Sequence, residues 1–250
     1  MIFTIAAREL RSLFLSPLAW AILAVTLFIL AYLFLTQIET FIGLQARLAT
    51  IKGAPGVADI IVAPLLADAA VVLLLITPLI TMRTISEERR NRTISLLFSA
   101  PVSMTEIVIG KYLGILSFFI ILLALLALMP LSLLAGTDLD LGKLAAGMLG
   151  LTLVVAAFSA IGLYMSSLTE QPTVAAVTTF GLLLLLWIID WAGTTEATGS
   201  SMLAQLSMLR HYEPLLKGLF NSTDVAYYLL IILLFTGFTI RRMDASRLQH

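Results

Sequence analysis

The chain has 250 residues, of which 60% are hydrophobic and only 12% are charged, and its mean hydropathy is +1.05. Ordinary soluble domains carry about 25% charged residues, so this composition excludes a soluble enzyme, a nucleic-acid-binding module and a disordered linker. The 15 basic and 15 acidic residues balance, and the absence of cysteine excludes disulfides, thiolate nucleophiles and cysteine metal sites. Most of the chain must therefore face lipid.

The N-terminal residues 1–16 have an amphipathic pattern. One helical face collects the apolar side chains of Ile2, Phe3, Ala6, Leu10, Leu13 and Phe14, and the other collects Arg8, Arg11 and Ser12. This pattern predicts an interfacial helix that lies along the membrane before the first span. The alternative is a polar extension of that span. A cleaved signal peptide is disfavoured, because the uncharged stretch that follows is too long for a signal core.

Six stretches are long and apolar enough to cross a bilayer, which needs roughly 20 such residues per helix. We predict an all-α polytopic membrane protein with one transmembrane domain over residues 1–250. Its spans are expected at 17–38, 61–82, 112–136, 144–167, 172–191 and 225–241. Asp68 is the one charge well inside a span. Its carboxylate either makes a structural hydrogen bond or marks a translocation path.

The distribution of Lys and Arg predicts the orientation. Ten of the 15 basic residues fall in the two terminal segments and in residues 83–111, against five in the opposite loops. The positive-inside rule then places both termini in the cytoplasm. We expect a multi-pass protein of a bacterial inner membrane.

Two predicted external segments are longer than a turn needs. Residues 39–60 show helical apolar spacing from Phe41 onward, and residues 193–224 include a second helix that Pro214 can start. Both are too short for an extracytoplasmic domain. They either cap the outer mouth of the bundle or anchor the spans in the interface.

The predicted cytoplasmic segment contains two capping-box patterns. Thr84 with Glu87 predicts a helix over residues 84–100, and Ser103 with Glu106 predicts the start of the helix that enters the third span. Pro101 separates the two helices. The stretch ISLLFSAP is too apolar for a loop in water, so it should rest on the ends of the spans or on a partner protein.

Other motifs point to no catalytic or metal site. His211 and His250 are expected on opposite sides of the membrane, so they cannot share a metal ion. Gly110 and Gly114 form a GxxxG pattern, which indicates close helix packing. The chain has no G-x-x-x-x-G-K-[ST] phosphate loop, so any ATP must be handled by another chain.

Three strings carry a family resemblance. EERRNRTISLLFSAPVSMTEIVIGKYLG (87–114) resembles the segment typical of type-2 ABC exporter permeases, in which charged residues precede T-hydrophobic-LL-S-x-P-V and E-hydrophobic-GK. AARELRSLFLSPLAW (6–20) also fits that family. HYEPLLKGLFNSTDVAYYLLIILLFTGFTIRR (211–242) resembles the end of the gliding-motility (Gld) branch, which is similar to permeases linked to copper-enzyme maturation. One departure is Arg92, which stands where many members have glycine.

The resemblance implies a six-helix half-transporter of the type-2 ABC exporter fold that pairs with a second copy or a homologous permease. It also implies ATP-binding subunits, which hold ATP and Mg²⁺ and dock on the cytoplasmic face, so this chain would be no enzyme itself. The 84–100 helix would be the coupling element. The residues expected to transmit the movement are Glu87, Glu88, Arg89, Arg90, Thr93, Leu97 and Pro101.

The sequence therefore predicts the permease subunit of an ATP-driven exporter. One alternative is a non-transporting ABC membrane subunit that relays force to an extracytoplasmic accessory protein through residues 39–60 and 193–224. Another is an ion-coupled carrier, for which Asp68 is the only support, since such carriers usually show more buried ionisable groups and broken helices.

Overall fold

The computed structural model describes residues 1–48, 56–91, 102–192 and 205–247. Within these ranges the chain forms helices and turns and contains no strand. The helices are α1 (Ile2–Leu15), α2 (Pro17–Leu48), the π-helical turn η1 (Ala58–Val62), α3 (Ala63–Thr81), α4 (Ser86–Arg90), α6 (Met104–Ser132), the 3₁₀ turn η2 (Leu133–Ala135), α7 (Leu141–Leu168), α8 (Pro172–Ala192), α10 (Met208–Leu216) and α11 (Ser222–Arg247).

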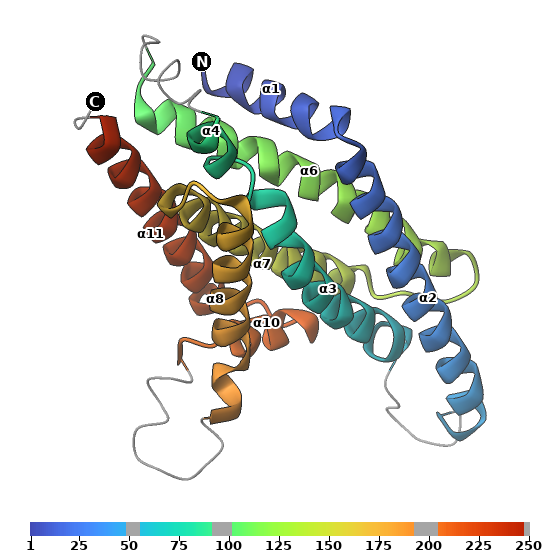
Figure 1. Cartoon of the computed structure of the whole chain (residues 1–250). Helices are drawn as coiled ribbons and strands as arrows, with labels where there is room; N and C mark the ends of the chain where they lie inside the picture. The colour runs from blue at the N-terminus through green and yellow to red at the C-terminus, as the bar shows by residue number, and fades with distance from the viewer. Residues whose placement is uncertain (49–55, 92–101, 193–204, 248–250) are drawn as a thin grey trace.

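Six helical stretches in the described part of the chain are long and apolar enough to span a membrane. They are Pro17–Gln45, Ala58–Arg90, Met104–Ala135, Leu141–Leu168, Pro172–Ile189 and Ser222–Arg247. The prediction of an all-α protein with six membrane helices is confirmed. Figure 1 places the start of α1, the end of α11 and α4 at one end of the bundle, as an even number of spans requires.

The first spanning helix is longer than predicted. α2 runs unbroken from Pro17 to Leu48, so no separate external helix begins at Phe41. The polar residues Gln37 and Glu39 end the apolar run but are good helix formers, and no proline interrupts the chain before Pro55. Polarity marks the end of the membrane core here, whereas the helix itself continues.

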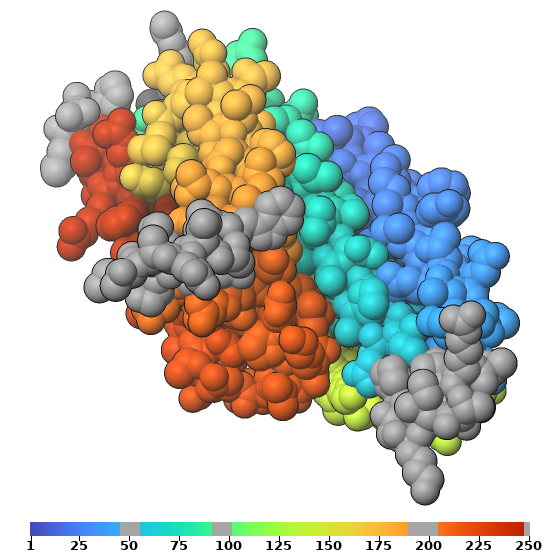
Figure 2. Space-filling model, turned by 90° about the horizontal axis from the view of Figure 1, so that it is seen from below, coloured from blue at the N-terminus to red at the C-terminus, as the bar shows by residue number. Residues whose placement is uncertain are grey.

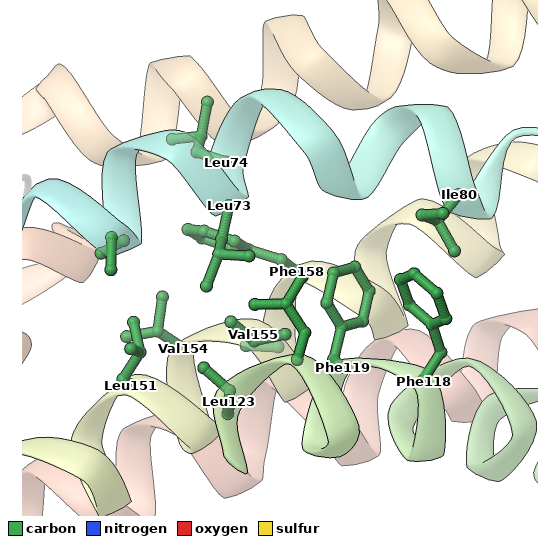
Figure 3. Close-up of a cluster of buried hydrophobic side chains, with 14 of the residues drawn as sticks. Leu73, Leu74, Ile80, Phe118, Phe119, Leu123, Leu151, Val154, Val155 and Phe158 are labelled. Carbon is green, nitrogen blue, oxygen red and sulfur yellow. The ribbon is translucent and has the colours of Figure 1, made fainter. Parts of the chain in front are cut away.

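α7 is the central helix of the bundle. In the most apolar 18-residue stretch of α7, 67% of the residues are buried inside the protein. The corresponding share is 17% in α8 and in α11. Side chains from three helices meet around it: Leu73 of α3, Phe119 of α6 and Phe158 of α7 point into one cluster (Figure 3). Gly162 lets α3 cross α7 closely, because a Cβ atom there would lie 2.2 Å from the Thr81 hydroxyl.

Helix α10 covers the end of the bundle opposite the chain termini. Seen from that end, α10 (orange) lies against α8 (gold) and beside α3 (teal), and α2 (blue) forms the far edge (Figure 2). The fully buried Tyr212 hydroxyl donates to the Leu66 carbonyl of α3 at 2.9 Å. Burial raises the pKa of this phenol well above its usual range, so it remains a hydrogen-bond donor.

The start of α10 differs from the prediction. The helix begins at Met208 with Ser207 as its cap, whose hydroxyl accepts the Arg210 N–H at 3.3 Å, and Pro214 lies inside the helix. The Ser207 cap decides the start, and in a helix of nine residues the missing N–H of Pro214 removes little.

The two predicted capping boxes have opposite outcomes. Ser103 and Glu106 form a complete box at the start of α6, with side-chain-to-backbone bonds of 3.2 Å in both directions. The box predicted at Thr84 and Glu87 is wrong. α4 begins at Ser86, its N-cap is Ile85, and no side chain of its own turn caps it.

Candidate coupling site at the end that holds both termini

The start of α4 is buried against α7. Ile85 and Ser86 have no exposed surface, and the Ser166 hydroxyl of α7 accepts both of their backbone N–H groups at 3.1 Å. The same hydroxyl donates to the Met82 carbonyl at 3.1 Å. One serine thus uses its single donor and both lone pairs to hold the turn between α3 and α4 on α7.

A buried lysine ties the other side of α4 to two more helices. Lys111 of α6 is 1% exposed, and its ammonium donates to Glu88 of α4 at 2.7 Å, to the Thr84 carbonyl at 2.9 Å and to Glu9 of α1 at 3.3 Å. All three donors are therefore satisfied, as a buried ammonium requires. We call Glu9, Thr84, Glu88 and Lys111 the Lys111 cluster.

Helix α1 is fixed to α6 next to this cluster. A Cβ atom on Gly110 would lie 2.7 Å from the Ile5 Cβ, and one on Gly114 would lie 2.6 Å from the Glu9 Cβ. The Gly110–Gly114 motif therefore forms the contact between α1 and α6 within one chain. This close approach brings the Glu9 carboxylate within reach of Lys111.

Two open clefts flank α4. One, of about 610 Å³, lies between α4, α1 and the ends of α2 and α3, and Arg8, Ser12 and Lys111 contribute to its walls. The other, of about 750 Å³, lies between α4 and the α7–α8 turn, with Arg90 and Glu170 in its walls. Arg83, Glu87 and Asn91 line both clefts, so the exposed edge of α4 is a ridge between two hollows.

The structure brings part of the predicted coupling set together. Glu87 and Arg90 are exposed on α4, whereas Glu88 belongs to the Lys111 cluster. Arg89 is partly buried on the same helix. Three further residues predicted for this site lie outside the described residues: Thr93, Leu97 and Pro101.

Asp68 lies apart from this site, within α3. The Gln37 amide of α2 donates to its carboxylate at 3.0 Å, and the carboxylate is half-buried. The contact agrees with the structural interpretation of this residue. It links the two adjacent spans α2 and α3.

Sequence reasoning did not single out Lys111, Glu9 or Ser166 as site residues. Lys111 did carry a signal, because it is a cation just before an otherwise uncharged run of membrane length, and such a cation needs partners. Glu9 and Ser166 lie far from α4 in sequence, so no local pattern indicates their role.

Comparison with known families shows what the chain is similar to. The model of a family described as ABC-2 family transporter protein matches residues 3–245, which is nearly the whole chain. No curated protein matches the chain in a sequence search. The match agrees with the six apolar helices, and permeases of this family normally pair with ATP-binding subunits. The chain therefore belongs to the ABC-2 transporter family, as a multi-pass permease subunit of an ABC transporter.

Proposed function

We propose that this permease works in an ATP-driven exporter and that the segment 84–100, which includes α4, couples it to the ATPase. ATP and Mg²⁺ are bound by the partner ATP-binding subunits, and a second copy or a homologous permease completes the membrane part. The observation that carries this proposal is the Lys111 cluster. It joins α4 to α1 and α6 through one buried ammonium.

The mechanical argument follows from the packing. A force on α4 has short, buried connections to three other helices: through Lys111 to α6 and α1, and through Ser166 to α7. Interiors packed at protein density transmit such a displacement with little loss. Movement of the ATPase would thus tilt α6 and α7 together.

The surface around α4 suits a partner that recognises both charge and shape. Glu87 and Arg90 stand exposed on the ridge, with a cleft on either side. Charges on such a rim set the orientation and rate of docking. The apolar anchor would come from the adjoining sequence around Leu97.

The docking test reverses exposed charges. Glu87→Lys with Arg90→Glu should leave membrane levels unchanged, weaken co-purification of the ATP-binding subunit and reduce substrate-linked ATP hydrolysis. Arg210→Glu is the matched control, because Arg210 is exposed at the opposite end of the bundle. Docking that survives the double reversal and Leu97→Ala together would remove α4 and its adjoining sequence from the coupling role.

Leu97→Ala tests the apolar anchor. A fully buried leucine contributes about 2 kcal/mol, which corresponds to roughly 30-fold weaker binding of the ATP-binding subunit. Glu88→Lys is a poor docking test, because Glu88 pairs with Lys111 inside this chain. A lysine at that position would instead disrupt the permease itself.

The proposal includes the orientation and the branch of the family. Both termini and α4 are taken as cytoplasmic on the basis of the ten-to-five distribution of basic residues, and the closer kinship to the Gld branch rests on the string 211–242.

Because the chain has no cysteine, single Ser246→Cys and Ser200→Cys variants give clean labels. They should react from opposite sides of the membrane. Labelling of both from one side would contradict the orientation.

A further inference from the structure

His211 of α10 sits between two hydrogen-bond acceptors. Its Nδ1 lies 2.7 Å from Asp224 Oδ1 at the start of α11, and its Nε2 lies 3.1 Å from the Gln205 carbonyl oxygen. The side chains are largely buried, with 18% of His211 and 8% of Asp224 exposed. The ring therefore joins three segments: the chain before α10, α10 itself and the first turn of α11.

The two contacts together fix the protonation state that fits. A carbonyl oxygen and a carboxylate oxygen can only accept, so each ring nitrogen must carry a hydrogen to bond its neighbour. Only the imidazolium has both hydrogens. Neutral histidine would point a nitrogen lone pair at Gln205 O or, worse, at the Asp224 carboxylate.

We infer that His211 is a proton-binding site, and that the bound proton fastens α10 to the start of α11. Release of the proton leaves one of the two contacts repulsive and loosens α10 from the bundle. Histidine is the side chain suited to this role, because its charge normally changes between about pH 5 and pH 8.

The surroundings favour the charged ring. The Tyr227 ring stacks on the His211 ring with a centroid separation of 4.0 Å, an arrangement that attracts a cation. Within the described residues, Asp224 Oδ2 is buried and has no hydrogen-bond partner, so the ring is the principal compensation for this carboxylate. Tyr227 and Tyr228 also donate to the Leu206 and Met208 carbonyls at 2.6 and 2.7 Å.

Other charged groups at this end are engaged elsewhere or face water. On α10, Arg210 and Glu213 are exposed, and Glu213 lies 3.7 Å from Lys217. On α7, Lys143 is held by Asp59 of η1 at 2.7 Å. On α3, Asp68 is bonded to Gln37. Residues 172–189 of α8 carry no charge. Among the described residues, Asp224 is thus the acidic side chain that contacts His211.

The sign of the pH dependence follows from the geometry. The fastened arrangement holds the proton more tightly than the loosened one, because only there do both ring N–H groups have an acceptor in place. By linkage, acid stabilises the fastened arrangement, and a rise in pH weakens it. In the predicted orientation this site faces the extracytoplasmic side, so external protons would set the position of α10.

Nitrogen NMR on the full chain tests the protonation state. The chain has two histidines, so ¹⁵N-histidine labelling of His250→Gln in nanodiscs reports His211 alone. At about pH 6, within the range where histidine titrates, both ring nitrogens should show the chemical shifts of an imidazolium. As the pH is raised this imidazolium signal should disappear, and in Asp224→Asn it should disappear at a lower pH. A neutral ring at that pH, or a titration unchanged by Asp224→Asn, would overturn the inference.

Cysteine labelling tests the link to α10. Met208 is fully buried on α10, so a Met208→Cys thiol should react with a water-soluble maleimide several-fold faster as the pH rises, beyond the change at the exposed control Asp138→Cys. The control corrects for thiol ionisation. His211→Gln, which cannot titrate, should abolish the excess. Two results would show that His211 does not hold α10. One is an identical pH dependence of the labelling rate at both cysteines, and the other is an extra rate increase at Met208→Cys that persists in His211→Gln.

Discussion

Ser166 on α7 accepts the backbone N–H of Ser86 at 3.1 Å, and so caps the first turn of α4 from another helix. The same hydroxyl also accepts the Ile85 N–H. The first N–H groups of a helix have no partner inside it, and these two are buried. The position of α4 is therefore set by α7 as much as by the chain that leads into it.

Ser166→Ala should loosen α4. Loss of a cap costs about 1 kcal/mol, so the melting temperature of the purified permease should fall and coupling to the ATPase should weaken while insertion stays normal. Ser167→Ala is the matched control, because Ser167 is equally buried and, among the described residues, donates to the Tyr164 carbonyl of its own helix rather than to α4. If both variants lower the melting temperature and weaken coupling equally, loss of the Ser166 cap is not the cause.

Lys111→Met should be strongly destabilising. It removes the cation that Glu9 and Glu88 share, and the loss should lie near the lower end of about 3–5 kcal/mol because both carboxylates keep some access to water. Lys111→Arg should not restore the lost stability, because the planar guanidinium of arginine cannot direct hydrogens at three acceptors that surround a single nitrogen. Thermal melting measures both variants.

Lys143→Met supplies the comparison for that experiment. Lys143 also pairs with a carboxylate at 2.7 Å, but both side chains are 34% exposed, so its removal should shift the melting temperature far less. Similar shifts for the two lysine variants would show that burial does not set the strength of the Lys111 cluster.

Gly114→Ala should separate α1 from α6. The new methyl group would lie 2.6 Å from the Glu9 Cβ, and overpacking of this kind costs about 1–3 kcal/mol. A thiol at the buried Ala6 should then become more reactive. Gly237→Ala, on α11, meets no atom within 4 Å among the described residues and should be neutral. If Gly114→Ala is as stable as wild type and leaves the thiol at position 6 unreactive, the tight contact between α1 and α6 is contradicted.

Asp68→Asn should preserve assembly and transport. The Gln37 Oε1 is buried without a partner among the described residues, so an asparagine can accept from the Gln37 amide and donate back to it. Asp68→Leu would leave that amide unpaired, at a cost of about 1–3 kcal/mol. Transport that stops in Asp68→Asn, with normal assembly, would move this residue into the translocation path.

The features that could be predicted from sequence are those fixed by the bilayer or by near neighbours in the chain. The span of α6 follows from an uncharged run of membrane length, and its start follows from Ser103 and Glu106, which are three residues apart. The GxxxG pattern also identified a close contact correctly. Its partner, α1, could not be read, because nothing in the residues 110–114 indicates which helix approaches them.

The features that could not be predicted depend on contacts between distant segments. Thr84 and Glu87 have the residue types of a capping box. The turn before α4 packs against α7 instead, and there the Ser166 hydroxyl oxygen accepts the N–H groups at the start of α4. Lys111 finds partners 23, 27 and 102 residues away. Local propensity is a weak guide wherever tertiary hydrogen bonds compete with it.

The order in which the ribosome makes these residues has a consequence for assembly. Glu9, Thr84 and Glu88 all precede Lys111, so every acceptor is already present when the ammonium is made. Ser166 follows Ser86 by 80 residues, which is about 4–16 s at a synthesis rate of roughly 5–20 residues per second. During that interval the start of α4 lacks its cap, and α4 reaches its final position only when α7 has been made.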